Sequence, residues 1–255
     1  MQAEREKMIA AEVNEHIVEI QNLHKSFAHC EVLKGVSLLV NKGENLVVLG
    51  KSGSGKSVLI KCIVGLMEPD EGLVKVFGRD ISGLNYKALN AMRTKIGFLF
   101  QGAALYDSMT VGENLSFPLK HHFKKMSRSE RSNRISETLD SVGLAEAIDK
   151  MPSELSGGMS KRVGLARSLI LNPEIMLYDE PTTGLDTVTA REISELIVTL
   201  QKKNRISSII ITHDMACAKL TADRIILLKD GQITAQGSYE ALAASEDDWV
   251  KSFFY

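Results

Sequence analysis

The sequence has few cysteines, and its three, Cys30, Cys62 and Cys217, are far apart along the chain. Solitary cysteines exclude a zinc knuckle built from cysteine pairs, and three of them give no even-numbered disulfide framework. We therefore expect a chain that works in a reducing compartment.

Long apolar runs are also missing. Runs such as IILL and SIII extend over only a few residues, well short of the roughly 20 that cross a bilayer. The first residues, MQAEREKMIAAEVNEH, are too acidic for a signal peptide. We therefore expect a chain that does not itself span a membrane, which leaves attachment to a membrane surface open.

An excess of charge of either sign is absent. The 31 Lys and Arg residues nearly balance the 32 Asp and Glu residues, for a formal net charge of -1. Without an overall basic field, nucleic acid is not expected as a partner. The hydrophobic content of 44% in 255 residues is ample for a large core.

The order of apolar segments predicts an α/β fold. Strand-like segments cover residues 16–21, 36–40, 44–50, 72–78, 95–101, 174–180, 207–214 and 223–237, the last with an Asp-Gly hairpin turn. A helix is expected from about Lys56 to Met67, and the stretch from Gly102 to about Asp149 looks like a polar, helical insertion. Strands that alternate with helices indicate a largely parallel sheet.

The segment GKSGSGKS matches a phosphate-binding pattern that follows a strand and opens a helix. Its backbone N–H groups and the helix N-terminus suit phosphate, and Lys56 is expected to reach the β- and γ-phosphates. The hydroxyl of Ser57 is a hard ligand for Mg²⁺. The candidate nucleotide-binding residues are Gly50, Lys51, Ser52, Gly53, Ser54, Gly55, Lys56 and Ser57.

Two carboxylates follow the strand in IMLYDE. Asp179 is placed to hold the magnesium shell and Glu180 to polarise an attacking water, although adjacent acids after a strand also serve as a helix cap. Gln101 and His213 are each the first polar side chains after apolar strands. In an open α/β sheet, ligands gather at that end of the strands.

A second glycine-rich helix start occurs in SELSGGMSKRVGLAR. Ser156 is a favourable N-cap, Gly157 and Gly158 allow close approach of the backbone, and Met159 begins the apolar stripe. The stripe predicts burial of Met159, Val163, Ala166 and Ile170, with Lys161 and Ser168 facing away. Taken alone, the segment is consistent either with a second phosphate cradle or with a capped helix.

Together these segments resemble the nucleotide-binding subunit of an ABC transporter, over residues 17 to about 245. The resemblance implies a P-loop NTPase of the ABC ATPase fold, with a RecA-like core, an N-terminal antiparallel β subdomain and an inserted helical subdomain. We divide the chain into an N-terminal extension (1–15), an ABC ATPase domain (16–245, with the helical subdomain at about 102–170) and an aromatic tail (246–255).

The resemblance also implies site roles. ATP and Mg²⁺ are the expected ligands, and the expected assembly is a head-to-tail homodimer in which residues 156–159 of one subunit close on the nucleotide of the other. Glu180 is then the catalytic base and His213 contacts the γ-phosphate. Gln101 senses the magnesium and links to the permease. Phe27 stacks on adenine, unless it is a core residue, and Asp186 contacts the opposite subunit.

The LSGGM variant and the segment LFQGAALYDSMTVGENLSFPL are similar to the ATPases of Mla-type phospholipid transporters. That similarity implies phospholipid transport across the Gram-negative envelope, from the cytoplasmic face of the inner membrane. The implied partners are a membrane permease, an MCE-domain lipid-binding protein and a small STAS-domain subunit. Tyr106, Met109 and Phe117 then contact the permease or pack within the helical subdomain.

Other interpretations stay open. The segment LHKSFAHCEVLKGVSL reads much like a polar amino-acid importer, and a soluble ABC protein is a third class. The basic run at 120–134 is either a solvated helix face or a contact for lipid headgroups. Trp249 and Phe253, spaced i and i+4, dock on their own domain or on a neighbouring subunit. The direction of transport is not specified.

Overall fold

The computed structural model describes residues 16–28 and 30–254, so the predicted N-terminal extension lies outside the described residues. The chain forms two compact units. The first holds the described residues up to Asn90 and those from Ala222 onward, and the second holds Ala91–Thr221.

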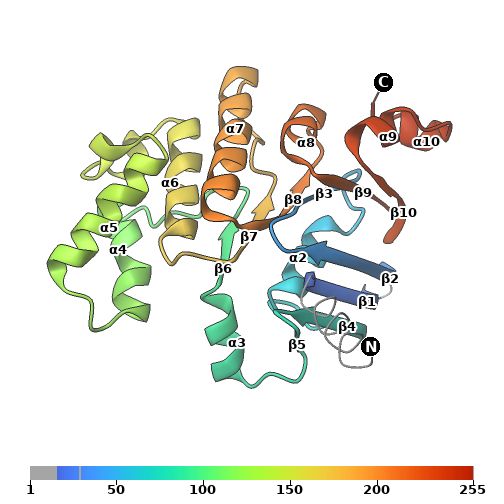
Figure 1. Cartoon of the computed structure of the whole chain (residues 1–255), viewed down its shortest axis with the longest axis horizontal. Coiled ribbons are helices and arrows are strands. Elements are labelled where there is room, and N and C mark those ends of the chain that lie inside the picture. The colour runs from blue at the N-terminus through green and yellow to red at the C-terminus, as the bar shows by residue number, and fades with distance from the viewer. Residues whose placement is uncertain (1–15, 29, 255) are drawn as a thin grey trace, which may run out of the picture. The chain divides into compact units, whose positions relative to one another are not determined.

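The first unit contains a four-stranded antiparallel sheet with the order β2-β1-β4-β5 (Figure 1). The strands are β1 (His16–Phe27), β2 (Cys30–Asn41), β4 (Glu71–Val76) and β5 (Arg79–Asp80). Val18 pairs with both Val40 and Val76, and all three are buried, because alternate residues of each strand face the core. This sheet confirms the predicted N-terminal antiparallel region.

The first unit contains three more strands, of which β3 (Asn45–Leu49) runs directly into the phosphate loop. β3 pairs in parallel with β9 (Arg224–Lys229), which forms an antiparallel hairpin with β10 (Gln232–Gly237). All five residues of β3 are buried. The predicted Asp-Gly turn is confirmed, since Asp230 and Gly231 have φ values of 48° and 84°.

The helix after the phosphate loop, α2 (Lys56–Ile63), is shorter than predicted. Gly65 has a φ of 67°, and the next N–H, of Leu66, donates to the carbonyl of Lys61 at 2.8 Å. This left-handed glycine closure ends the helix before Met67, which the apolar periodicity alone did not reveal.

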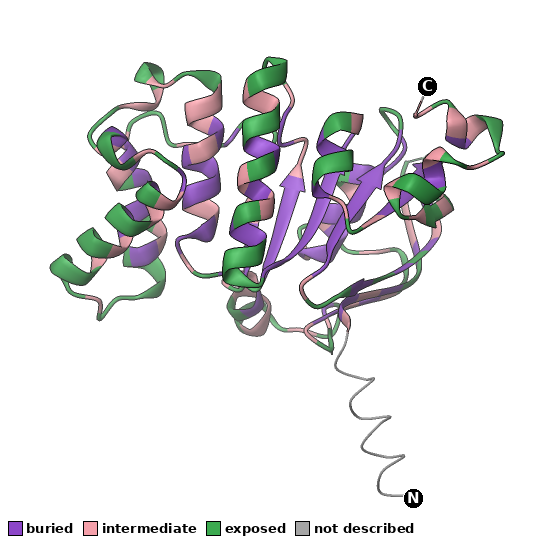
Figure 2. Ribbon diagram, turned by 45° about the horizontal axis from the view of Figure 1, so that its top comes forward, coloured by how far each residue is buried: buried purple, intermediate pink, exposed green. Residues whose placement is uncertain are grey.

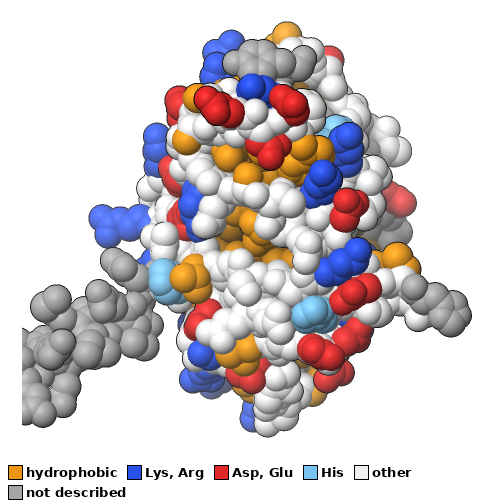
Figure 3. All heavy atoms as spheres, turned by 90° about the vertical axis from the view of Figure 1, so that its right-hand side faces the viewer, with side chains coloured by type: hydrophobic (Ala, Val, Ile, Leu, Met, Phe, Trp, Pro, Cys, Tyr) orange, Lys and Arg blue, Asp and Glu red, His pale blue; other side chains and the backbone are white. Residues whose placement is uncertain are grey.

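The aromatic tail docks on its own unit. In α10 (Asp248–Lys251) Val250 is buried, and the ring of Phe254 lies edge-on to Tyr239 of α9 (Tyr239–Ala243) at 5.2 Å. Trp249 contacts Phe253 at 4.9 Å, as their spacing predicted. The side of the molecule that carries β10, α9 and α10 shows apolar side chains among acidic and basic ones (Figure 3).

The second unit contains parallel strands in the order β8-β7-β6. These are β6 (Ile96–Leu99), β7 (Ile175–Asp179) and β8 (Ser207–Thr212). The α/β pattern and the parallel pairing predicted from the sequence are confirmed. The polar residues that follow β6, β7 and β8 therefore share one edge of this sheet.

Helices make up most of the second unit (Figure 1). They are α4 (Val111–His122), α5 (Arg128–Ser141), α6 (Gly157–Leu169), α7 (Thr187–Asn204) and α8 (Met215–Thr221), with 3₁₀ turns at Ala145–Ala147 and Pro152–Glu154. Helix α7 buries the face formed by Ile193, Ile197 and Leu200 and exposes the opposite face (Figure 2). α3 (Tyr86–Arg93) contains the boundary between the units.

Helices α4, α5 and α6 pack on one another inside the predicted helical region. α4 and α5 begin with capping boxes, in which Thr110 and Ser127 accept hydrogen bonds from the N–H groups of Glu113 and Glu130. The boundaries 102–170 for a helical subdomain stay a prediction. Among residues 16–28 and 30–254, no helix combines the length and the apolar character that crossing a bilayer requires.

Candidate functional site

The phosphate loop belongs to the first unit and is closed by its own lysine. The ammonium of Lys56 donates to the carbonyl oxygens of Gly50 at 2.7 Å and Lys51 at 3.1 Å. Lys56 is buried at the start of α2, whose N-cap, Gly55, has no side chain to cap the helix. The loop thus keeps its lysine at a helix N-terminus, which is an anion-binding arrangement.

Two glycines of this loop are required by their surroundings. A Cβ at Gly50 would lie 2.4 Å from the carbonyl oxygen of Leu228. Gly55 has a φ of 103°, and a Cβ there would lie 2.9 Å from the carbonyl oxygen of Val32. Any other residue would push the loop away from β2 and β9, so the cradle keeps its shape only with glycine.

Ser54 lies inside the phosphate loop. Its hydroxyl oxygen is buried and has no hydrogen-bond partner among the described residues. A buried hydroxyl without a partner is costly, and a phosphate oxygen would satisfy it. Lys51, Ser52, Gly53 and Ser57 are exposed around it, which leaves the loop open to solvent.

Phe27, at the end of β1, is not a core residue. Its side chain is 43% exposed, and the ammonium of Lys25 lies 5.6 Å from the centre of the ring. Lys25 is itself held by Asp70 at 2.6 Å. An exposed ring on a rigid strand suits stacking, so the adenine role stays a prediction and the core alternative is excluded.

The second unit brings Glu180 and His213 together. Nδ1 of His213 lies 2.9 Å from Oε2 of Glu180. The Glu180 side chain is 13% exposed and that of His213 is 66% exposed, so the carboxylate is sheltered from solvent and the imidazole is not. The hydroxyl of Thr183 also donates to Oε2, at 3.2 Å. These contacts orient the carboxylate.

The backbone of Glu180 is held in an unusual conformation. Its φ is 52°, in the left-handed region that costs a non-glycine residue free energy. Its N–H donates to the carbonyl of Ile211 on β8 at 2.9 Å. Asp179, the last residue of β7, stands directly before it. Asp179 is therefore carried by the end of a strand and Glu180 by a strained turn, and neither residue is the N-cap of a helix.

The serine of the second glycine-rich segment caps α6 as predicted. Oγ of Ser156 accepts a hydrogen bond from the N–H of Met159 at 3.3 Å. Gly157 is exposed, whereas a Cβ at Gly158 would lie 2.5 Å from Cγ2 of Thr189 on α7. Gly158 thus has a packing role beside any role toward a ligand, and closure on a second subunit stays a prediction.

The expectation that Lys161 and Ser168 face away from the core is wrong, since the hydroxyl of Ser168 donates to the carbonyl of Phe98 on β6. Lys161 is buried, and its ammonium donates to the carbonyl oxygens of Gln101 and of Glu180, the latter at 3.3 Å. Helix α6 packs on two sides, so its apolar stripe marks only one of them. The signal for the second side is the spacing of Lys161, Gly164 and Ser168 at i, i+3 and i+7.

Gln101 lies in an exposed turn after β6, on the main chain that Lys161 holds. Its exposed position leaves the amide available to a ligand at the strand end. Asp186 caps α7, since Oδ1 accepts from the N–H groups of Val188 and Thr189 at 3.0 Å. The hydroxyl of Thr189 donates to Oδ2 at 2.6 Å, and these bonds hold the pKa of the Asp186 carboxyl below its usual range. The contact of Asp186 with another subunit stays a prediction.

Each predicted magnesium ligand is of a chemical type that suits Mg²⁺. The hydroxyl of Ser57, the carboxylate of Asp179 and the amide oxygen of Gln101 are hard oxygen ligands, and Mg²⁺ usually takes one or two carboxylates together with phosphate oxygens. In the part of the chain that the structure describes, no three His, Cys, Asp or Glu side chains gather in a group that could hold a metal ion.

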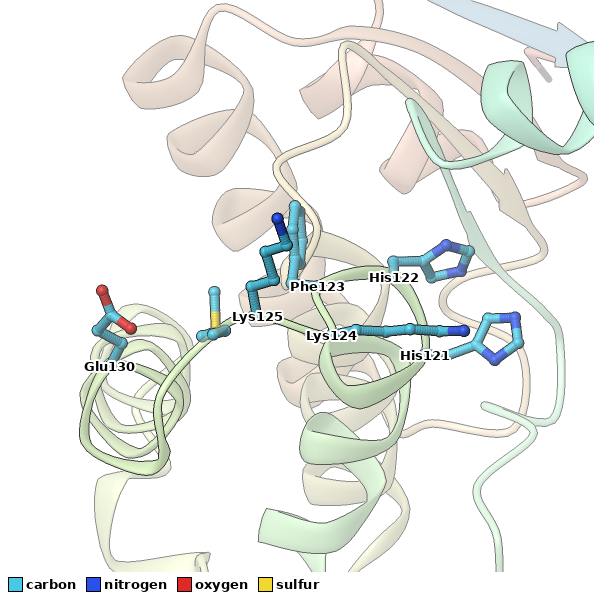
Figure 4. A pocket seen from close by; sticks show the side chains of 7 residues that line it. His121, His122, Phe123, Lys124, Lys125 and Glu130 are labelled. Atoms are coloured by element: carbon cyan, nitrogen blue, oxygen red, sulfur yellow. The ribbon is translucent and has the colours of Figure 1, made fainter.

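Two further features lie on the helical part of the second unit. Tyr106 and Phe117 are each 45% exposed, and their rings lie 5.1 Å apart. A hollow of about 590 Å³ lies at the corner of α4 and α5 (Figure 4). It is lined by His121, His122, Phe123, Lys124, Lys125, Met126 and Glu130. It contains none of the predicted site residues, and the choice between a solvated face and a headgroup contact stays open.

Comparison with known proteins adds a family match. Residues 33–183 match the family model described as ABC transporter. The protein trigalactosyldiacylglycerol 3 of Arabidopsis thaliana, described as chloroplastic, is 38% identical over 93% of this chain and 73% of its own length. A methionine import ATP-binding protein, MetN of Rhizobium johnstonii, is 38% identical over 92% of this chain and 64% of its own length. The chain thus spans less than two thirds of the MetN relative.

A solved structure is similar over nearly its whole length. The post-hydrolysis dimer of the ATP-binding cassette MJ0796, bound to ADP and Pi, has a TM-score of 0.80 and 35% identity, over 87% of this chain and 98% of that chain. At 35% identity, this likeness supports membership of the same family as well as the same fold.

Proposed function

The chain belongs to the ABC transporter family and is an ATP-binding, ATP-hydrolysing subunit, and we propose that the transport it drives is of phospholipid. The observation that carries the ATPase assignment is the contact between the sheltered carboxylate of Glu180 and the imidazole of His213. A carboxylate held in this way at a strand end can accept a proton from an attacking water.

We assign the chemical steps to residues of this chain. Lys56 and the N–H groups of the loop bind the phosphates, while Phe27 stacks on the base. Glu180 takes the proton of the attacking water, and His213 orients that carboxylate and contacts the γ-phosphate. Ser57, Asp179 and Gln101 would hold Mg²⁺, which neutralises charge on the phosphates when it is bound.

The site of one chain is incomplete without a second copy. A second helix N-terminus, that of α6 with Ser156 as its cap, lies in the same chain as the phosphate loop. A nucleotide on one loop exposes its γ-phosphate, and the α6 N-terminus of another copy would cover it. The family member MJ0796 forms a dimer, which supports a head-to-tail homodimer here. Asp186 would lie at that contact.

Phospholipid is proposed as the cargo on two grounds. LSGGM and the segment at 99–119 are similar to Mla-type ATPases, which favours phospholipid, and one relative takes its name from a galactolipid, which favours the wider class of lipids. The exposed pair Tyr106 and Phe117 in that segment offers an apolar contact for a permease. An MCE-domain lipid-binding protein and a small STAS-domain subunit complete the proposed assembly, on the cytoplasmic face of the inner membrane.

A second candidate cargo is an amino acid. MetN of Rhizobium johnstonii, named for methionine import, is as similar in identity as the lipid-related relative, at 38%. The methionine at position 159 argues against this candidate, because LSGGM is similar to the Mla-type ATPases. The two candidates imply different partners, so isolation of the assembly separates them.

The test is to purify the tagged full chain from native membranes in mild detergent and to identify the proteins and lipids that accompany it. Phospholipid transport predicts a polytopic permease, an MCE-domain protein and bound phospholipid. A permease with a substrate-binding protein for amino acids, without lipid enrichment, would overturn the cargo proposal. A matched preparation of the Tyr106→Ser, Phe117→Ser variant should lose the permease if these rings form the contact.

A further inference from the structure

Lys161 is a buried charge that the proposed chemistry does not use. It lies in the second turn of α6, four residues after Gly157, and its side chain is enclosed within the second unit. The ammonium donates to the carbonyl oxygens of Gln101 and Glu180. Because a buried ammonium needs such partners, the two carbonyl groups fix its position.

Two nearby carboxylates, those of Glu180 and Asp179, also attract this ammonium. Burial lowers the pKa of Lys161, while attraction by the carboxylates of Glu180 and Asp179 opposes that effect. The carboxylates of Glu180 and Asp179 thus offset part of the cost of burying this ammonium.

The main chain of Glu180, to which Lys161 donates, is strained. Its φ of 52° is a conformation that a non-glycine residue keeps only where neighbours fix it. The carbonyl oxygen of Glu180 accepts from the N–H of Thr183 and from the ammonium of Lys161, both at 3.3 Å. Loss of the ammonium removes a charge-assisted hydrogen bond from the strained peptide that carries the carboxylate.

Helix α6 also packs closely on the loop after β6, which carries Gln101, the second partner of Lys161. A Cβ at Gly164 would lie 3.0 Å from Cβ of Ala103, so the helix and the loop touch closely. The hydroxyl of Ser168 donates to the carbonyl of Phe98 at 2.9 Å, and the guanidinium of Arg167 donates to that of Ala103 at 3.3 Å. Displacing α6 therefore displaces the Gln101 loop.

We propose that Lys161 is a positioning residue of the ATPase reaction, whose ammonium ties the main chain of Gln101 to that of Glu180 and couples both to the helix that begins at Ser156. The proposal rests on the proposed roles of Glu180 and Gln101. It assigns the communication between the α6 N-terminus and the hydrolytic carboxylate to one side chain.

The test compares Lys161→Met, which keeps an unbranched apolar stem and removes the ammonium, with Lys161→Arg, which keeps a charged donor. We expect Lys161→Met to lower kcat by roughly 100-fold, the scale of a misplaced catalytic group, with unchanged ATP affinity. Lys161→Arg should recover part of the rate. Lys202→Met, at an exposed lysine near the end of α7, is the matched control and should keep the original rate.

Normal turnover of Lys161→Met, or a rate loss explained by weaker ATP binding, would overturn the proposal. Circular dichroism and a urea midpoint report whether this variant folds. If it does not, Lys161→Arg is compared with Lys161→Gln, which is shorter and uncharged. The proposal then requires faster turnover of the Arg variant, and equal rates would overturn it.

A double-variant cycle separates a positioning role from a structural one. If Lys161 acts through Glu180, then Lys161→Met should add little to the loss caused by Glu180→Gln. Fully multiplied losses would indicate independent structural damage. Slow hydrolysis by Glu180→Gln with normal hydrolysis by Lys161→Met rejects only the Lys161 proposal, whereas normal hydrolysis by Glu180→Gln rejects the proposed catalytic role of Glu180 on which it rests.

Discussion

Glu180 and His213 face each other across 2.9 Å, and they come from the ends of neighbouring parallel strands, β7 and β8. This pairing arises because parallel strands present their carboxyl ends at one edge of the sheet. The imidazole is mostly exposed and the carboxylate is not, so His213 is the more accessible side chain of the pair.

Glu180→Gln should slow ATP hydrolysis by about two orders of magnitude or more while ATP binding persists, because the amide keeps the shape of the side chain but accepts no proton. The measurement is a single-turnover rate together with nucleotide affinity. Glu195→Gln, at an exposed glutamate paired with Arg191 on α7, is the control. A near-normal rate for Glu180→Gln would rule out its role as the base.

Lys56→Ala should weaken ATP binding by about 10- to 100-fold, because it removes charged hydrogen bonds to the phosphates, each worth about 1.5–3 kcal/mol. Nucleotide titration measures this change. Lys61→Ala, on the same helix α2, is the control for loss of a lysine. Unchanged ATP affinity in Lys56→Ala would contradict the assignment of the cradle.

Ser156→Arg in one subunit of a mixed dimer should abolish hydrolysis at the site whose phosphate loop belongs to the other subunit. The loss follows if the α6 N-terminus closes in trans. Marking one subunit with Lys56→Ala leaves a single competent loop and shows which site is lost. Ser127→Arg, at the N-cap of α5, controls for loss of a cap alone, worth about 1 kcal/mol. Loss at the subunit's own site would refute closure in trans.

Gly158→Ala should destabilise the fold by about 1–3 kcal/mol, the cost of overpacking, because the new Cβ would meet Cγ2 of Thr189 at 2.5 Å. Thr189 cannot turn away freely, since its hydroxyl is bonded to Asp186. Urea denaturation measures the loss. In a Thr189→Ser background, which removes the methyl and keeps the hydroxyl, the same change should be neutral or stabilising by up to about 1 kcal/mol, as alanine favours helix. An equal loss in both backgrounds would disprove the packing explanation.

Local patterns specified much of the architecture. The phosphate loop was predictable because its glycines, lysine and serine act within eight consecutive residues between a strand and a helix. The same holds for the Asp-Gly hairpin at 230–231 and for Ser156 as a helix cap, whose hydrogen bonds span only a few residues. The end of α2 was missed because Gly65 closes that helix through its backbone conformation, which apolar periodicity does not record.

The sequence by itself therefore determined the fold class, the phosphate cradle and the polar residues that end each strand, because these follow from short-range periodicity, helix capping and glycine geometry. Tertiary structure alone decided that Lys161 is buried and that its ammonium donates to the main chain of Gln101 and Glu180. These partners lie 60 and 19 positions away from it in the sequence. Tertiary structure likewise decided that Gly158 is required by Thr189 on another helix. Helix α6 packs on two sides because the loop after β6 and helix α7 lie against it. The apolar stripe in its own sequence marks only one of these sides, so the contacts on the other depend on the fold.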